Sequence, residues 1–300
     1  MRVAVIGLGG VGGYIAASFA KAGVDVIGFA RGEHLKAIQT QGIKIVEDEN
    51  CWDVDLDARA LDDLDGYFEG SFDAVLFCVK SYDLADSYEH IKSHIDNKTI
   101  LISFSNGVSN ADTLRGLSNS RVLDGCVYIL SHIESAGVIR KKGKVFAAVF
   151  GGEKNATGAF ASLFEKAQLR FKTPDDIETA IWKKYIFIAS FATLTSYYDK
   201  SIGYIYEHKR DEARELLKEI ANVAKDKGID IEVEIDKALE TASKVPYDSS
   251  TSMYLDFKNG KKVELENLSG YIANYEGVKT PLMKKMYEKL LNTMKRVDNE

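Results

Sequence analysis

Short apolar runs alternate with amphipathic stretches through the first half of the chain. Buried strands are predicted over residues 2–7, 24–30, 73–79, 99–104 and 121–127, and helices over 11–22, 33–40, 82–96 and 109–116. The first strand, the first helix and the second strand form one βαβ unit, for which connection rules expect a right-handed crossover and a parallel sheet. The pattern therefore predicts an α/β fold with a doubly wound parallel sheet.

The pattern changes after Pro174, which ends the last strand-like run. From there the apolar positions recur with helical spacing, and helices are predicted over 176–198, 209–228, 232–244, 250–258, 263–275 and 282–297. We therefore expect two domains, an α/β domain over residues 1–174 and an all-helical domain over residues 175–300.

An acidic stretch over residues 44–72 interrupts the α/β pattern. Within it the segment WDVDLD alternates, which puts three apolar residues on one strand face and Asp53, Asp55 and Asp57 on the other. The three aspartates have the spacing of calcium-loop ligands, but such a loop needs glycine at its sixth position and glutamate at its twelfth. Alanine and leucine stand there instead, so we predict a solvated strand face and no metal site.

The composition argues against several classes of function. The 300 residues include 39 basic and 45 acidic ones, a formal net charge of −6, so the chain is a poor candidate for binding nucleic acid or an anionic membrane. The longest apolar run, over 185–194, is shorter than the stretch of about 20 residues that spans a bilayer. Three scattered cysteines match no zinc pattern, and the N-terminus lacks a signal-peptide pattern, so we expect a cytoplasmic protein.

A glycine-rich turn, GLGGVG, follows the first strand and opens the first helix. In dinucleotide-binding βαβ units the first glycine permits a tight turn. The second lets the backbone approach the pyrophosphate, and the third lets helix and strand pack closely. We therefore predict a Rossmann-type loop; the alternative is a glycine-rich turn without a ligand. The predicted cofactor-binding residues of this loop are Gly7, Leu8, Gly9, Gly10, Val11 and Gly12.

Arg31, just beyond the second strand, indicates which dinucleotide is bound. NAD-binding units usually place an acidic residue there for the ribose 2′-hydroxyl, but the strand ends in Gly-Phe-Ala-Arg. A guanidinium can bind a 2′-phosphate through charge-assisted hydrogen bonds, so we expect NADP in preference to NAD. The alternative for Arg31 is a solvated surface charge that pairs with Glu33.

Two further polar residues follow predicted strands. Lys80 comes directly after strand 73–79, and Asn106 follows strand 99–104. Because the carboxyl ends of strands face the ligand crevice in these sheets, we expect Lys80 to contact the cofactor and Asn106 the cofactor or the substrate. Each residue also has an ordinary interpretation, a solvated loop lysine and an Asn-Gly turn.

These features together resemble the ketopantoate reductase (2-dehydropantoate 2-reductase) family, nearly from end to end. Besides the glycine loop and Arg31, the matching pieces are VK at 79–80, NG at 106–107, GG at 151–152, WKK at 182–184, SM at 252–253 and ELENLSG at 264–270. The ordered set of Lys184, Ser252, Glu264 and Gly270 in a helical domain is more specific than the glycine motif.

The resemblance implies an activity and roles for individual residues. The family reduces 2-dehydropantoate to pantoate with NADPH, in the pathway to pantothenate and coenzyme A. Its catalytic residues align with Lys184 and Glu264, and its substrate-binding residues with Ser252 and Asn106, the latter also a cofactor contact. The chemistry suits the lysine, because reducing a ketone needs a proton source and positive charge near the developing alkoxide. Without the resemblance, Lys184 would be interpreted as a lysine extending from an amphipathic helix.

Several positions depart from the family pattern. The asparagines usual at four and eight residues after the catalytic lysine are Ile188 and Ala192 here, and the one usual three residues before the serine is Ser249. A glutamine common after the first-domain lysine is replaced by Asp83. Hydroxyl groups that could replace the lost amides belong to Ser190, Thr193, Thr195, Ser249 and Ser250. Our hypothesis is a divergent paralogue with a more apolar pocket, a substrate contact at Ser249, and another 2-keto acid as substrate.

Two other functions stay open at this point. One is another hydroxyacid dehydrogenase of the same two-domain build, and the other is a non-catalytic NADP-binding sensor. Retention of both Lys184 and Glu264 argues against the sensor. The expected partners are a small 2-keto acid and a second copy of the chain, with no nucleic acid and no membrane.

Overall fold

The computed structural model describes residues 1–48, 50–66 and 69–297. Its chain divides into two compact units. Unit 1 holds residues 1–105 and 109–177, and unit 2 holds residues 106–108 and 178–300. The short segment 106–108 therefore leaves unit 1 and packs with unit 2, a detail that no local sequence pattern predicts.

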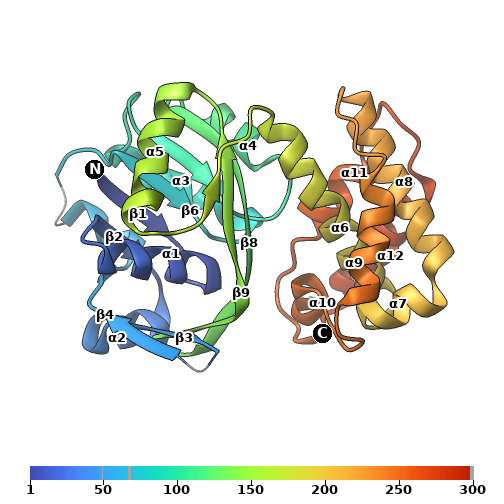
Figure 1. Ribbon diagram of the computed structural model, residues 1–300, viewed down its shortest axis with the longest axis horizontal. Helices are drawn as coiled ribbons and strands as arrows, with labels where there is room; N and C mark the ends of the chain where they lie inside the picture. The colour runs from blue at the N-terminus through green and yellow to red at the C-terminus, as the bar shows by residue number, and fades with distance from the viewer. Residues whose placement is uncertain (49, 67–68, 298–300) are drawn as a thin grey trace. The chain divides into compact units, whose positions relative to one another are not determined.

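A parallel sheet forms the centre of unit 1 (Figure 1). Its strands run in the spatial order β5-β2-β1-β6-β7-β8, and each neighbouring pair is parallel. This is the doubly wound order in which the chain reverses direction beside β1, so the predicted fold class is confirmed. The strands are β1 (Arg2–Ile6), β2 (Asp25–Phe29), β5 (Asp57–Arg59), β6 (Ala74–Phe77), β7 (Ile100–Ser103) and β8 (Arg121–Ser135).

Beyond β7 the sheet continues as a long antiparallel hairpin. β8 pairs with β7 only at its start and then with β9 (Val138–Gly151) through the rest of its length. β3 (Ile43–Glu47) and β4 (Asn50–Val54) extend this edge, and β10 (Phe171–Lys172) pairs with β9. The strand predicted over 121–127 is therefore the first half of a much longer one.

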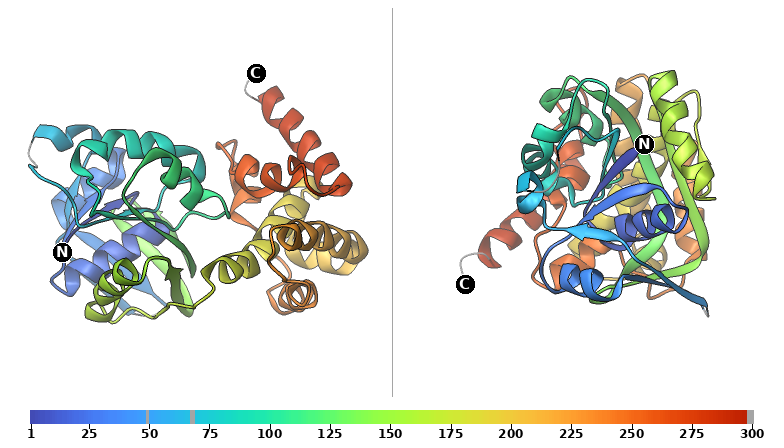
Figure 2. Two further views of the ribbon diagram at one scale, coloured as in Figure 1. Left: turned by 90° about the horizontal axis from the view of Figure 1, so that it is seen from above. Right: turned by 90° about the vertical axis from the view of Figure 1, so that its left-hand side faces the viewer.

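Helices cover both faces of the sheet in unit 1, because successive residues of each buried strand point to opposite faces. Val3 and Val5 of β1 pack with the face that carries α1 (Gly10–Lys21), α2 (Gly32–Gln41) and α5 (Lys154–Lys166). Ala4 and Ile6 pack with the face that carries α3 (Leu84–Ile91) and α4 (Asn110–Leu117). Figure 2, left, shows α3 and α4 on one side of the strands and α5 on the other.

Unit 2 is entirely helical within the described residues (Figure 1). Its core gathers the apolar faces of its helices around the fully buried Ile186, Phe191 and Leu217. Its helices are α6 (Ile177–Tyr198), α7 (Ile202–His208), α8 (Arg210–Asp226), α9 (Glu234–Lys244), α10 (Ser252–Lys258), α11 (Tyr271–Ala273) and α12 (Pro281–Val297), with a π-helical turn, η4, over Glu266–Gly270.

The sequence pattern missed or simplified several elements. Helices α5 and α7 are absent from the predicted set, and the predicted helix 82–96 is α3 flanked by short 3₁₀ turns over Ser81–Asp83 and Lys92–His94. Alternation in WDVDLD is confirmed in burial, but the segment is divided between β4 and β5. Another 3₁₀ turn covers Leu61–Gly66.

Three findings bear on the classes of protein considered above. No helix among the described residues combines the length and apolar character needed to cross a bilayer. All three cysteines are free thiols, and burial raises the pKa of Cys78 to about 12, so this thiol is unreactive. The described part of the chain also contains no cluster of histidine, cysteine and acidic residues that could hold a metal ion.

Candidate active site

The glycine loop after β1 has the backbone geometry of a tight strand-to-helix turn. Gly7 has a φ of +92°, and a Cβ there would lie 2.9 Å from the carbonyl oxygen of Cys78. A Cβ on Gly12 would lie 2.1 Å from the carbonyl oxygen of Gly7, so only glycine permits this approach of α1 to the strand. A Cβ on Gly9, in contrast, would meet nothing within 4 Å.

Open space at Gly9 lies at the amino end of α1, where the first N–H groups of the helix have no intrahelical partner. Such a helix end attracts phosphate groups through its N–H donors and its dipole. Gly10 in the same turn is close to the hairpin, because a Cβ there would lie 2.5 Å from the carbonyl oxygen of Ser131. Leu8 is buried, and its side chain packs over Gly28 of β2. The loop therefore fits a dinucleotide pyrophosphate at Gly9.

His34 of α2 fastens this loop to the hairpin, a role that the sequence did not suggest. Its Nε2 lies 2.8 Å from the carbonyl oxygen of Leu8, and the backbone N–H of Gly137 donates to its Nδ1 at 3.0 Å. Because a carbonyl only accepts and an amide N–H only donates, the ring must be neutral with its proton on Nε2. Burial lowers the pKa of His34, despite an opposing effect of the hydrogen bond to Leu8.

Arg31 extends into solvent at the carboxyl end of β2. Its side chain is 94% exposed, and its guanidinium lies 3.9 Å from the carboxylate of Asp83, which follows β6. This exposure agrees with the alternative of a solvated surface charge, while Glu33, suggested there as a partner of Arg31, pairs with Lys36 at 2.9 Å. Lys80 is half-buried and follows β6, so Gly7, Arg31 and Lys80 all follow the carboxyl ends of parallel strands in unit 1.

Lys184 lies on α6 and is half-buried, whereas its neighbour Lys183 is exposed. The Lys184 ammonium donates a hydrogen bond to Oδ1 of Asn106 at 2.8 Å. Nδ2 of Asn267 donates to the backbone carbonyl of Asn106 at 2.6 Å. The structure thus joins the predicted pair Lys184 and Asn106 and adds Asn267, which sequence reasoning overlooked although it lies inside the ELENLSG motif.

The remaining predicted residues of unit 2 lie on two segments. Glu264 is 5% exposed and lies two residues before Glu266, where η4 begins. Ser252 begins α10, which Thr251 caps by accepting a hydrogen bond from the backbone N–H of Tyr254. Ser249 is half-buried, and its carbonyl accepts from the backbone N–H of Ile202 at 2.8 Å, which ties the start of α7 to this segment.

Comparison with known proteins identifies the family. A family model described as Ketopantoate reductase PanE/ApbA matches residues 3–152, and one described as Ketopantoate reductase PanE/ApbA C terminal matches residues 176–294. The chain belongs to the ketopantoate reductase family.

Individual relatives agree with this membership. The uncharacterized oxidoreductase YkpB of Bacillus subtilis is 28% identical, over 97% of this chain and 98% of its own. The crystal structure of a ketopantoate reductase from Ralstonia eutropha is 26% identical with a TM-score of 0.90, over 99% of this chain and 100% of its own. D-mandelate dehydrogenase, solved with NADH and anilino(oxo)acetate, shares the fold at 17% identity and a TM-score of 0.88, over 99% of this chain and 100% of its own.

The departures from the family pattern have different structural consequences. Ala192 is 1% exposed and lies in the helical core, whereas Ile188 is half-buried and packs at the edge of that core. The suggestion that hydroxyls of α6 replace the lost amides is wrong for three residues. All three are fully buried and donate to the carbonyl four residues earlier: Ser190, Thr193 and Thr195. Ser249 and Ser250 keep access to solvent.

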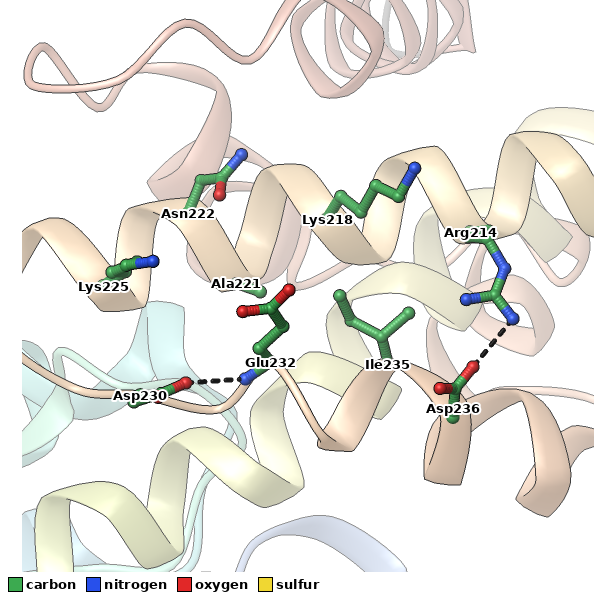
Figure 3. A pocket seen from close by; sticks show the side chains of 9 residues that line it. All are labelled: Arg214, Lys218, Ala221, Asn222, Lys225, Asp230, Glu232, Ile235 and Asp236. Carbon is green, nitrogen blue, oxygen red and sulfur yellow. Dashed lines mark hydrogen bonds and ion pairs between the residues drawn. The ribbon is translucent and has the colours of Figure 1, made fainter.

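A separate groove lies between α8 and α9 of this ketopantoate reductase family member (Figure 3). Its volume is about 290 Å³, and its charged side chains balance, with three cationic and three acidic ones. Arg214 and Asp236 already pair across it at 2.7 Å. The groove contains none of the predicted site residues, and its balanced charge favours no ionic ligand. The lining residues are Arg214, Lys218, Ala221, Asn222, Lys225, Asp230, Glu232, Ile235 and Asp236.

Gly12 and Gly9 predict losses of stability of different size. Gly12→Ala should lower the free energy of unfolding of unit 1 by at least about 2 kcal/mol, because its Cβ overlaps the carbonyl of Gly7. Gly9→Ala should cost less than about 1 kcal/mol, because its Cβ enters open space. Urea unfolding followed by Trp52 fluorescence in a Trp182→Phe background measures both. Equal losses would contradict the geometry.

His34 predicts a pH dependence of the stability of unit 1. Its folded pKa is lowered from the ordinary value of 6.5, so the unfolded chain takes up a proton first as the pH falls. Stability is therefore complete above pH 6.5 and declines below it, toward the folded pKa. Between about pH 7.5 and about pH 5, wild type should lose more stability than His34→Gln, which lacks this titration. Parallel pH profiles for the two proteins would contradict the assignment.

Proposed function

We propose that the protein is an NADPH-dependent reductase of 2-dehydropantoate or a similar 2-keto acid, with Lys184 as the general acid. Family membership supports reduction of a 2-keto acid. The observation that carries the finer proposal is the hydrogen bond from the Lys184 ammonium to Asn106, two half-buried residues of unit 2. It holds a cationic proton donor at a defined position instead of leaving it mobile in solvent.

The proposal divides the labour between the predicted domains. The α/β domain, residues 1–174, would hold NADPH at Gly7–Gly12, Arg31 and Lys80, and the helical domain, residues 175–300, would hold the keto acid. Bound NADPH supplies the hydride. The fit rests on the open space at Gly9 beside the amino end of α1, which suits the pyrophosphate.

Lys184 supplies the electrostatic and acidic part of the reaction. As negative charge develops on the keto oxygen, the ammonium stabilises it and then donates a proton from Nζ to that oxygen. An ammonium has three N–H donors, so it can hold Asn106 and donate to a substrate in the same state. Asn106 accepts one of these hydrogen bonds through its neutral Oδ1, so this contact orients the lysine without neutralising it.

The remaining residues are assigned to substrate binding. The carboxyl group of Glu264 is proposed to orient Lys184 or to bind a substrate hydroxyl, and Ser252 and Ser249 to bind polar groups of the substrate. Ile188 stands where the resemblance leads us to expect an asparagine. Its apolar side chain can pack against an apolar substrate tail but cannot form a hydrogen bond with a substrate hydroxyl, so a 2-keto acid with a less polar tail is favoured. A substrate other than 2-dehydropantoate therefore remains the second candidate.

Lys184→Met tests the catalytic assignment. Loss of the general acid should lower kcat/KM by about 10²- to 10⁴-fold for the best 2-keto acid of a panel that includes ketopantoate. The affinity for NADPH, measured by fluorescence titration, should change little, because Lys184 is assigned to the substrate. Lys183→Met is the matched control, since Lys183 is the exposed neighbour on the same helix. If Lys184→Met retains full activity, or if Lys183→Met loses as much, the assignment is wrong.

Arg31 and Asp83 test the choice of cofactor. Arg31→Ala should raise the Kd for NADPH about tenfold and leave the Kd for NADH nearly unchanged, because only NADPH carries the 2′-phosphate. Asp83→Asn should tighten NADPH binding by a few fold, since the carboxylate lies 3.9 Å from the guanidinium and repels a phosphate. The control is Lys36→Ala, which removes an exposed positive charge from α2, the helix that directly follows Arg31. Equal changes for NADH and NADPH in Arg31→Ala would refute the NADP assignment.

A further inference from the structure

We propose that Asn267 is a positioning residue, which fixes the Asn106–Gly107 turn and through it the catalytic ammonium of Lys184. This inference rests on the proposed function, because it assumes that the position of Lys184 determines the rate. All the residues involved belong to unit 2. Asn267 differs from Lys184 and Asn106 in that it acts on the reaction only through another residue.

The first observation is a chain of two hydrogen bonds. The Asn267 side-chain amide donates to the carbonyl oxygen of Asn106 at 2.6 Å, while Oδ1 of the same Asn106 accepts from Lys184 at 2.8 Å. One asparagine thus has its backbone held by a second asparagine and its side chain occupied by the lysine. Because the backbone position sets where the side chain can reach, losing the first hydrogen bond displaces the acceptor of the second.

The second observation is that Gly107 makes room for this contact. Gly107 has a φ of +125°, a conformation that side chains rarely adopt. A Cβ at this position would lie 2.1 Å from Nδ2 of Asn267, well inside the van der Waals distance. The glycine is therefore required both by the backbone turn and by the approach of the Asn267 amide.

The third observation is that Asn267 is itself anchored to the helix that carries Lys184. Asn267 lies in the π-helical turn η4, and π-helical turns often occur at functional sites. The hydroxyl of Tyr185 on α6 lies 2.7 Å from the carbonyl oxygen of Leu268 and 3.3 Å from that of Asn267. Burial raises the pKa of Tyr185 well above its ordinary value, so this hydroxyl keeps its proton and donates.

Together these contacts form a closed ring. Lys184 is held by Asn106, Asn106 by Asn267, and the turn of Asn267 by Tyr185, which is the next residue after Lys184. A ring of this kind fixes the lysine from both its side-chain and its backbone end. Removing one member should therefore affect the lysine more than the overall stability of unit 2.

The test compares Asn267→Ala with Asn222→Ala, an exposed asparagine on α8 that serves as the matched control. In Asn267→Ala, kcat should fall about tenfold, because displacement of Asn106 weakens the charge-assisted hydrogen bond that holds the Lys184 ammonium. The basic limb of the pH profile of kcat should move about one unit toward lower pH, because the ammonium loses its positioned acceptor. NADPH affinity and the melting temperature should stay near wild type, and the control should match wild type in all readouts.

A second variant, Gly107→Ala, tests the same contact while Asn267 stays in place, and it keeps the inference testable if Asn267→Ala is unstable. Gly107→Ala alone should cause a loss of kcat as large as that of Asn267→Ala, because its Cβ displaces the amide. Added to Asn267→Ala, the same Gly107→Ala should cost clearly less, since the clashing amide is gone and only the strain of the positive-φ backbone remains. Additive losses, or a wild-type pH profile in Asn267→Ala, would overturn the inference. If Lys184→Met retains full activity, the proposed function itself fails. If Lys184→Met loses activity but Asn267→Ala keeps the activity of the wild type, only the role of Asn267 is refuted.

Discussion

The hydrogen bond from the Lys184 ammonium to Oδ1 of Asn106 is the interaction on which the chemistry proposed for this protein depends. The acceptor comes from a three-residue segment that follows β7 and packs with unit 2 rather than with its own sheet. A flexible lysine loses side-chain entropy when it is held, about 2 kcal/mol of rotamer freedom for a fully fixed side chain. A charge-assisted hydrogen bond is of the size needed to offset that loss.

The shape of the glycine loop after β1 depends on a steric constraint. Gly12 lets α1 approach the strand so closely that no Cβ fits between them, and this approach aims the amino end of the helix at the open space beside Gly9. His34 then ties the loop to the hairpin through Leu8 and Gly137. Contacts within the chain therefore hold the loop in the shape proposed to bind the pyrophosphate, which would reduce the ordering cost of binding.

Local sequence patterns predicted what depends on local physics. Buried strands show as apolar runs, the glycine loop follows from backbone sterics, and α6 follows from its length of apolar residues. Local sequence patterns failed where residues far apart in the sequence determine the burial and the contacts of a side chain. The hydroxyls of Ser190, Thr193 and Thr195 suggested polar contacts for a substrate, yet they bond to carbonyls of their own helix inside the core. The contacts of Asn267 with Asn106 and of His34 with Gly137 span 161 and 103 residues, and no periodicity encodes them.

The proposed function depends on one step, the transfer of a hydride from NADPH to the keto carbon of a 2-keto acid. The most direct measurement uses NADPH deuterated at C4 of the nicotinamide, on each face in separate reactions, with mass spectrometry of the hydroxy acid product. We expect one of the two labelled cofactors to deliver a deuterium to C2 of the product. If the protein binds NADPH but neither label reaches any product of a broad 2-keto acid panel, the claim is contradicted and a non-catalytic sensor becomes the better description.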